Sequence, residues 1–231
     1  MKARLTGTLL SLGLTMGPAF PQEAERKAPL VLENAPAGTV LVDNDGGRVQ
    51  IVPPAAVPQG RLRHHGGLVL TAPEVEVVFL GSAWGEPSMR ATQERVLEHL
   101  GSFGRSREYQ TLQGYGLRSG HLPVTRTDDF GDPAKGVTIT DLEIQARLSA
   151  LGGAKGKDSV YLVLLAPGLE SMLGRSAAGK DFLAYHNHFF AEGGPVHYAV
   201  VPFRAESHKW LSSTTAALVQ TVVNPQGTAW Y

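Results

Sequence analysis

Two apolar runs restrict the folds that this chain can adopt. Residues 74–80 (EVEVVFL) change from alternating charged and apolar residues to a continuous apolar run, and residues 159–165 (SVYLVLL) are almost entirely β-branched, aromatic or aliphatic. Such runs predict strands that are buried on both faces of a sheet, because a strand with one solvated face alternates polar and apolar residues. The segment 159–165 is the best candidate for a central strand.

Two internal segments carry the signals of helices. Ser88 is predicted to cap the first helix, whose apolar residues recur at helical spacing and so share one face. These residues are Met89, Val96, Leu97, Leu100 and Phe103. The second helix is predicted to begin with the capping box of Thr140 and Glu143, to run through Leu151 and to end at the glycines 152–153.

The C-terminal segment predicts a third, buried helix. Hydroxyl side chains at residues 212–214 are suited to cap its start, and Leu218 and Val222 lie four residues apart on one face. Asn224 precedes a proline, which disfavours helical geometry in that residue, so the helix is expected to end there. The two rings at residues 230–231 are expected to dock the C-terminus onto the domain.

The remaining segments complete the predicted sheet. Short strands are expected over residues 68–71 and 137–139, and a hairpin over residues 184–203 turns through EGGP at 192–195. Residues 105–135 are less regular. Strands that alternate with helices, followed by a hairpin and a C-terminal core helix, predict a single α/β domain with a mixed β-sheet and flanking helices.

The N-terminal part of the chain predicts export. Residues 1–19 are interpreted as a signal peptide, because a basic start precedes a short apolar run and small residues suited to cleavage. A short buried helix is the simpler alternative. Residues 20–62 are a Pro/Gly-rich linker, in which the turn signal at 44–47 favours a hairpin, and residues 63–231 form the compact domain. We therefore expect a periplasmic or extracellular protein.

Composition excludes several classes of partner and chemistry. Lys and Arg total 21, Asp and Glu also total 21, so the chain has no basic field for nucleic acid. There is no cysteine, which excludes disulfides, thiolate metal sites and cysteine nucleophiles. The apolar run near the N-terminus is shorter than the ~20 residues of a permanent membrane span. Composition is compatible with a ligand on the cell exterior as the partner.

Several short motifs resemble the phosphate-induced protein 1 (EXORDIUM-like) family and its secreted bacterial relatives. They are HGGLVL at 65–70, VVFLGSAW at 77–84, YLVLL at 161–165, Tyr185-His186, YAVVPF at 198–203, Asn224-Pro225, Gly227 and Trp230-Tyr231. Together they span residues 63–231. The resemblance implies a zincin-like fold, in which the C-terminal helix resembles the metal-binding helix of zinc peptidases.

The resemblance also implies that this metal helix is degenerate. Relatives carry His-Glu-Leu-Ala-Glu before the Asn/Asp-Pro pair, with the two ligands four residues apart so that both face one ion. Aligning Asn224-Pro225 places the first ligand on Ala216, the neighbouring base on Ala217 and the second ligand on Gln220. Alanine has no donor atom and a neutral amide is a poor zinc ligand, so no catalytic residue and no cofactor are expected there.

A second metal site is the alternative. His186 and His188 would share one face of a strand, and His197 would approach from the next strand of the hairpin. Three imidazoles in that arrangement are suited to zinc with an open position for water. The simpler interpretation is that His186 is structural and that the other two are polar positions on a half-solvated strand.

Two further candidates are weaker. Ser82 follows a buried strand but lacks the Gly-x-Ser-x-Gly pattern of a nucleophile elbow. Asp128, Asp129 and Asp132 lack the ligand spacing of an EF-hand loop, so we expect a solvated turn there rather than a calcium site.

Two functions therefore stay open. The first is an exported, non-catalytic protein on a degenerate metallopeptidase-like domain, which binds a ligand or forms part of the cell exterior. The alternative is a metal-dependent hydrolase whose zinc site has moved to the histidines of the 186–197 hairpin.

Overall fold

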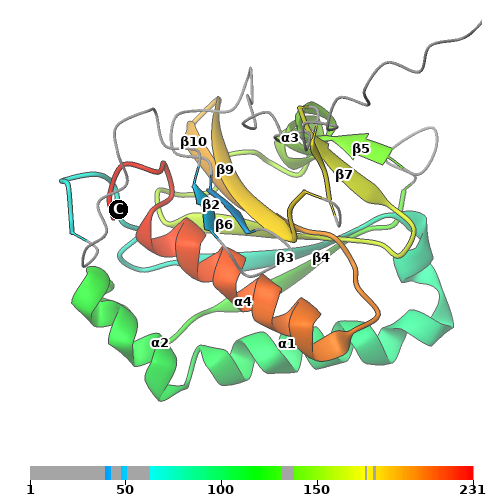
Figure 1. Ribbon diagram of the computed structural model, residues 1–231, viewed down its shortest axis with the longest axis horizontal. Coiled ribbons are helices and arrows are strands. Elements are labelled where there is room, and N and C mark those ends of the chain that lie inside the picture. Colours follow the sequence, from blue (N-terminus) through cyan, green and yellow to red (C-terminus); the bar gives the residue numbers. More distant parts are fainter. Residues whose placement is uncertain are drawn as a thin grey trace, which may run out of the picture.

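A computed structural model of the chain describes residues 40–42, 48–50, 63–131, 138–174, 176–178 and 181–230. Seven strands form one sheet in the order β2-β1-β9-β10-β6-β3-β4 (Figure 1). They are β1 (Val40–Val42), β2 (Arg48–Gln50), β3 (Glu74–Leu80), β4 (Val124–Asp129), β6 (Ser159–Leu165), β9 (Ala184–Ala191) and β10 (Gly194–Val201). The strands from β10 to β4 run parallel, whereas β9 is antiparallel to β10, and β1 is antiparallel to β9 and β2. The sheet is therefore mixed, as predicted.

Each face of the sheet has its own covering layer. Helices α1 (Arg90–Phe103) and α4 (Ser207–Val223) lie together on one face, and α2 (Arg107–Thr111) follows α1 (Figure 1). The other face carries α3 (Asp141–Ala150) and a small sheet of β5 (Thr138–Thr140), β7 (Glu170–Leu173) and β8 (Ser176–Ala177). The even-numbered residues 160–164 of β6 pack towards α1 and α4, and the odd-numbered residues 161–165 pack towards α3. These contacts confirm a single α/β domain in which β6 is central.

The helix signals are confirmed to different degrees. Thr140 and Glu143 form the predicted capping box of α3, with the Thr140 amide 2.7 Å from the Glu143 carboxylate. Ser88 was expected to cap α1, but this is wrong. Residues 87–89 form a turn of 3₁₀ helix, α1 begins at Arg90, and the Ser88 hydroxyl lies 3.5 Å from the Glu86 carboxylate instead.

The prediction that α4 begins at residues 212–214 is also wrong. The helix begins at Ser207, so these three hydroxyl residues lie inside it. Each hydroxyl donates to the backbone carbonyl four residues earlier, at 2.8 to 2.9 Å. Serine and threonine satisfy their hydroxyls in this way within helices, so a cap signal alone does not fix a helix start. The predicted end at Asn224 is confirmed.

Residues 68–71 do not form the predicted strand. The Leu70 amide donates to the carbonyl of Val222 at the end of α4, and the Thr71 carbonyl accepts from Arg118. The segment is thus bonded to a helix end and a loop rather than to a sheet. Residues 105–135, predicted as irregular, contain α2 and β4. The sequence of β4 is VTRTDD, and such polar residues suit an exposed edge strand. Because β4 contains no apolar run, the sequence pattern did not predict it.

The N-terminal hairpin is present, since β1 and β2 pair antiparallel. It does not stand apart from the domain, because β1 also pairs with residues 184–186 of β9. The predicted signal peptide, the turn at 44–47, Asp132 and Tyr231 lie outside the described residues. Within the part of the chain that is described, no helix is both long and apolar enough to cross a membrane.

Candidate functional site

Helix α4 carries Ala216, Ala217 and Gln220, the three positions at which the sequence resemblance predicts a degenerate metal helix. It packs across β9 and β10 (Figure 1). Its residues Ala217, Leu218 and Val222 belong to the apolar core. Ala217 is fully buried there, whereas Ala216 and Gln220 are half-buried at its margin. The Gln220 side-chain oxygen is buried and has no hydrogen-bond partner within the described residues. These positions therefore offer a single amide and no anionic or imidazole ligand.

The three predicted histidines lie on the same face of the sheet as α4. His186 and His188 alternate with Asn187 along β9, so both point to one side. His197 on β10 lies directly opposite His188, and cross-strand partners share a face. His186 lies opposite Ala199, which belongs to the core that α4 covers. The strand periodicity therefore predicted their common face correctly.

Two of these imidazoles are buried with unpaired nitrogens. The Nε2 atom of His186 lies 3.0 Å from the backbone oxygen of Asn224, which can only accept, so Nε2 carries the proton. This leaves the lone pair of its Nδ1 buried and unpartnered. His197 is 0% exposed, and neither of its ring nitrogens has a partner within the described residues. The ring centroids of His188 and His197 are 6.2 Å apart.

Burial keeps these rings neutral. Desolvation lowers the pKa of His186 to about 4, although the Asn224 carbonyl opposes the shift. Desolvation also lowers the pKa of His197 to about 4, and His188 adds to the shift by charge repulsion. The pKa of the half-buried His188 is lowered by the same cause. A neutral imidazole is the form that binds metal ions, so protonation does not prevent coordination near neutral pH.

The arrangement nevertheless lacks a preformed metal centre. Across the described residues, no three His, Cys, Asp or Glu side chains are grouped so that they could hold a metal ion. The three histidines share a face without forming such a group. The solvated turn predicted at Asp128 and Asp129 is wrong, because both residues lie at the end of β4. Asp128 forms an ion pair with Arg126 at 2.7 Å, and Asp129 forms one with Arg147 at 3.2 Å. Ser82 is exposed and begins the 3₁₀ helix (Ser82–Gly85) that follows β3.

A buried polar network on the opposite face of the sheet was not predicted. Both oxygens of the Asp141 carboxylate accept hydrogen bonds: Oδ1 from the hydroxyls of Tyr185 and Tyr198 at 2.7 and 2.8 Å, and Oδ2 from the amides of Gln145 and Asn187 at 2.8 and 3.3 Å. Burial, reinforced by the Asp141 charge, raises the pKa of both tyrosines well above its usual value. They stay protonated and donate, so the network holds α3 against β9 and β10.

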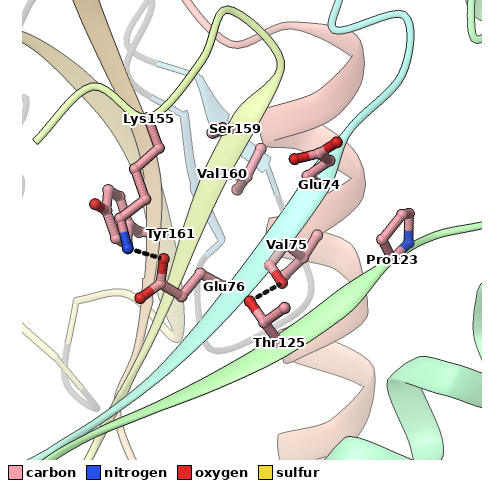
Figure 2. A pocket seen from close by; sticks show the side chains of 9 residues that line it. All are labelled: Glu74, Val75, Glu76, Pro123, Thr125, Lys155, Ser159, Val160 and Tyr161. Carbon is pink, nitrogen blue, oxygen red and sulfur yellow. Dashed lines mark hydrogen bonds and ion pairs between the residues drawn. The ribbon is translucent and has the colours of Figure 1, made fainter. Parts of the chain in front are cut away.

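A charged cleft lies at the starts of the parallel strands β3, β4 and β6. Figure 2 shows Glu76 and Lys155 pointing toward each other across it, with their charged atoms 2.6 Å apart. The Glu76 carboxylate also accepts from the Thr127 hydroxyl, and the Lys155 ammonium lies 5.4 Å from the centre of the Tyr161 ring. The cleft encloses about 300 Å³. The two central charges, Glu76 and Lys155, form an ion pair with each other. The remaining charged residue of the lining is Glu74, which is exposed at the margin of the cleft.

Comparison with known proteins adds no relative: the chain matches no protein-family model, no curated protein and no solved structure.

Proposed function

We propose that this chain is an exported, non-catalytic protein that acts by binding or as a component of the cell exterior. Its domain is a degenerate, zincin-like metallopeptidase domain related to the phosphate-induced protein 1 (EXORDIUM-like) family. The observation that carries the proposal is the side of α4 that faces the sheet. Ala217, at the position of the catalytic base, lies there in an apolar core with Leu218 and Val222, whereas a zinc helix would need a carboxylate at that position to activate water.

The chemistry of the surrounding side chains supports this proposal. Ala216 and Ala217 have no donor atoms, and Gln220 offers only a neutral amide. His186, which lies beneath the end of α4, donates to the Asn224 carbonyl. That bond fixes the end of the helix to β9, which is a structural use of the imidazole. In this proposal, apolar packing at Ala217 replaces the carboxylate that activates water in a working zinc helix.

One observation favours the alternative, a metal-dependent hydrolase with a relocated site. The unpaired nitrogens of His186 and His197 are buried, and a buried polar atom without a partner costs free energy. A zinc ion bound by His186, His188 and His197 would pair Nδ1 of His186 and one of the two ring nitrogens of His197. That arrangement requires the side chains to move into a common group, since the described residues do not hold one.

Zinc titration by calorimetry separates these functions. Three proteins are compared: wild type, Gln220→Ala on α4, and His188→Ala, which removes the half-buried imidazole of the hairpin. The proposal expects no tight zinc binding by any of them and no zinc-dependent rise in melting temperature, because a ligand that binds the folded state must stabilise it.

The two contrary results differ from each other. Tight binding of one equivalent that His188→Ala abolishes and Gln220→Ala leaves intact would establish the relocated site. Tight binding that Gln220→Ala abolishes would show that α4 still holds a metal. Either result overturns the non-catalytic proposal.

A further inference from the structure

A shallow groove lies where the C-terminus meets the start of the compact domain. Its walls come from residues 64–71, from the turn at residues 113–116 and from Trp230, and its volume is about 750 Å³. We call it the C-terminal groove. A volume of this size falls within the ~300–1,000 Å³ that small-molecule sites enclose.

Three rings form the rigid wall of the C-terminal groove. The Trp230 ring lies 5.0 Å from the ring of Tyr115 and 5.1 Å from that of His64, measured between centroids. The indole N–H of Trp230 donates to the Tyr115 carbonyl at 3.1 Å, and the His65 amide donates to the Ala229 carbonyl at 2.7 Å. Because backbone and side-chain bonds both hold Trp230, the aromatic wall is preorganised.

Glycines bring the walls together and leave open space between them. A Cβ atom at Gly67 would lie 2.3 Å from the backbone of Thr228, so only glycine permits this close approach to the C-terminal segment. At Gly114, in contrast, an added Cβ would meet no atom within 4 Å. The groove is therefore tight at its base and open along the turn.

The lining of the C-terminal groove carries aromatic, aliphatic and neutral polar groups. None of its lining residues is Asp, Glu, Lys or Arg, unlike the charged cleft of Figure 2, which holds Glu74, Glu76 and Lys155. Gln113 is exposed, and its side-chain amide makes no hydrogen bond within the described residues. The ligand that complements this lining is uncharged, covers aromatic rings and both donates to and accepts from an amide.

We propose that the C-terminal groove binds a neutral saccharide chain. The apolar C–H faces of sugar rings cover the rings of Trp230 and Tyr115, and the sugar hydroxyls donate to and accept from the Gln113 amide. This inference rests on the proposed function, because it names the class of ligand that an exported binding protein would take.

A proline-rich peptide is the competing occupant, since such peptides also dock onto aromatic grooves. Proline has no backbone N–H and cannot donate to the Gln113 side-chain oxygen. Sugar hydroxyls supply both donors and acceptors along the whole chain. The free amide of Gln113 therefore favours the saccharide.

The two open glycines give a matched test. Gly114→Leu places a side chain in the groove, whereas Gly120→Leu adds the same side chain at an exposed glycine outside it, where a Cβ also meets no atom within 4 Å. Calorimetric titrations use cellohexaose, xylohexaose, chitohexaose, hexagalacturonate and a decaproline peptide. Gln113→Ala is a further variant, because its exposed side chain has no internal bond to lose. Melting temperatures equal to that of wild type verify that each variant is folded.

We expect at least one neutral hexasaccharide to bind the wild type. Gly114→Leu should weaken that binding by about tenfold or more, Gln113→Ala should weaken it measurably, and Gly120→Leu should leave it unchanged. Three results would overturn the proposal. The wild type binds none of the neutral hexasaccharides, or it binds only decaproline or hexagalacturonate, or it binds a neutral hexasaccharide no more tightly than Gly114→Leu and Gln113→Ala do. Zinc titration is unaffected by these outcomes, so a failure of the saccharide site is distinct from a failure of the non-catalytic assignment.

Discussion

The Asp141 carboxylate lies where α3 meets the sheet, and four donors converge on it. Asp141→Ala would leave the buried hydroxyls of Tyr185 and Tyr198 without their acceptor. Losing charge-assisted bonds and leaving buried donors unpaired should lower the free energy of unfolding by about 3 kcal/mol or more. Urea unfolding measures this change.

Asp128→Ala is the matched control, because Asp128 forms an ion pair with Arg126 in which both side chains are more than a third exposed. We expect that control to cost less than about 1 kcal/mol. Similar losses for the two variants would show that the Asp141 network contributes little.

The buried imidazoles of His186 and His197 should make the protein sensitive to mild acid. Their pKa values of about 4 lie below the usual 6.5, so the unfolded chain takes up protons that the folded chain excludes. Their contribution to stability is therefore complete above pH 6.5 and declines as the pH falls towards 4, by on the order of 3 kcal/mol for the fully buried His186.

Thermal unfolding between pH 7 and pH 4 tests this dependence. His197→Leu removes one of the two titrating rings and should flatten the decline, whereas Glu94→Gln alters an exposed carboxylate of α1 and keeps both rings. If the melting temperature of His197→Leu falls with pH as steeply as that of wild type, other groups cause the loss of stability in acid.

At the scale of single elements, α4 carries both core positions and the positions that we propose to be degenerate. Leu218 is buried, and Leu218→Ala should cost about 2–5 kcal/mol through lost burial and the cavity left behind. Gln220→Ala removes a buried oxygen that has no partner, so the free energy of unfolding should change little. Chemical denaturation of the two variants decides this. A large loss for Gln220→Ala would reveal a structural bond at that position.

The sequence predicts the elements whose signals are local. Continuous apolar runs identify β3 and β6, and the capping box fixes the start of α3. The start of α4 and the whole of β4 are missed, because hydroxyl residues are satisfied inside a helix and an edge strand tolerates polar residues.

One part of the candidate site could be predicted from the sequence and another part could not. Period-two alternation places His186, His188 and His197 on one face correctly. The Asp141 network escapes prediction because it joins α3 to two strands that come far later in the chain, and nothing local marks Tyr185 and Tyr198 as partners of a carboxylate. Whether imidazoles converge depends on side-chain packing, which periodicity does not encode.

At the scale of the whole molecule, export is the prediction to test first. Mass spectrometry of the protein from its native host should find a chain that lacks the first 19 or so residues, outside the cytosol. A version with Leu9, Leu10 and Leu12 changed to Asp should stay inside the cell, because the apolar run needed for export is interrupted. Recovery of the wild-type chain with intact Met1 from the cytosolic fraction would contradict this prediction.

The central place of β6 between β3 and β10 has a kinetic consequence. The middle of the sheet joins residues 74–80, 159–165 and 194–201, so its contacts are strongly non-local. Folds of this kind form slowly, because the entropy of closing long loops is lost before the contacts form. The middle of the sheet cannot assemble until β10 has left the ribosome. Until then the apolar runs of β3 and β6 are unprotected, and a chain held in the cytosol is exposed to aggregation for that whole interval.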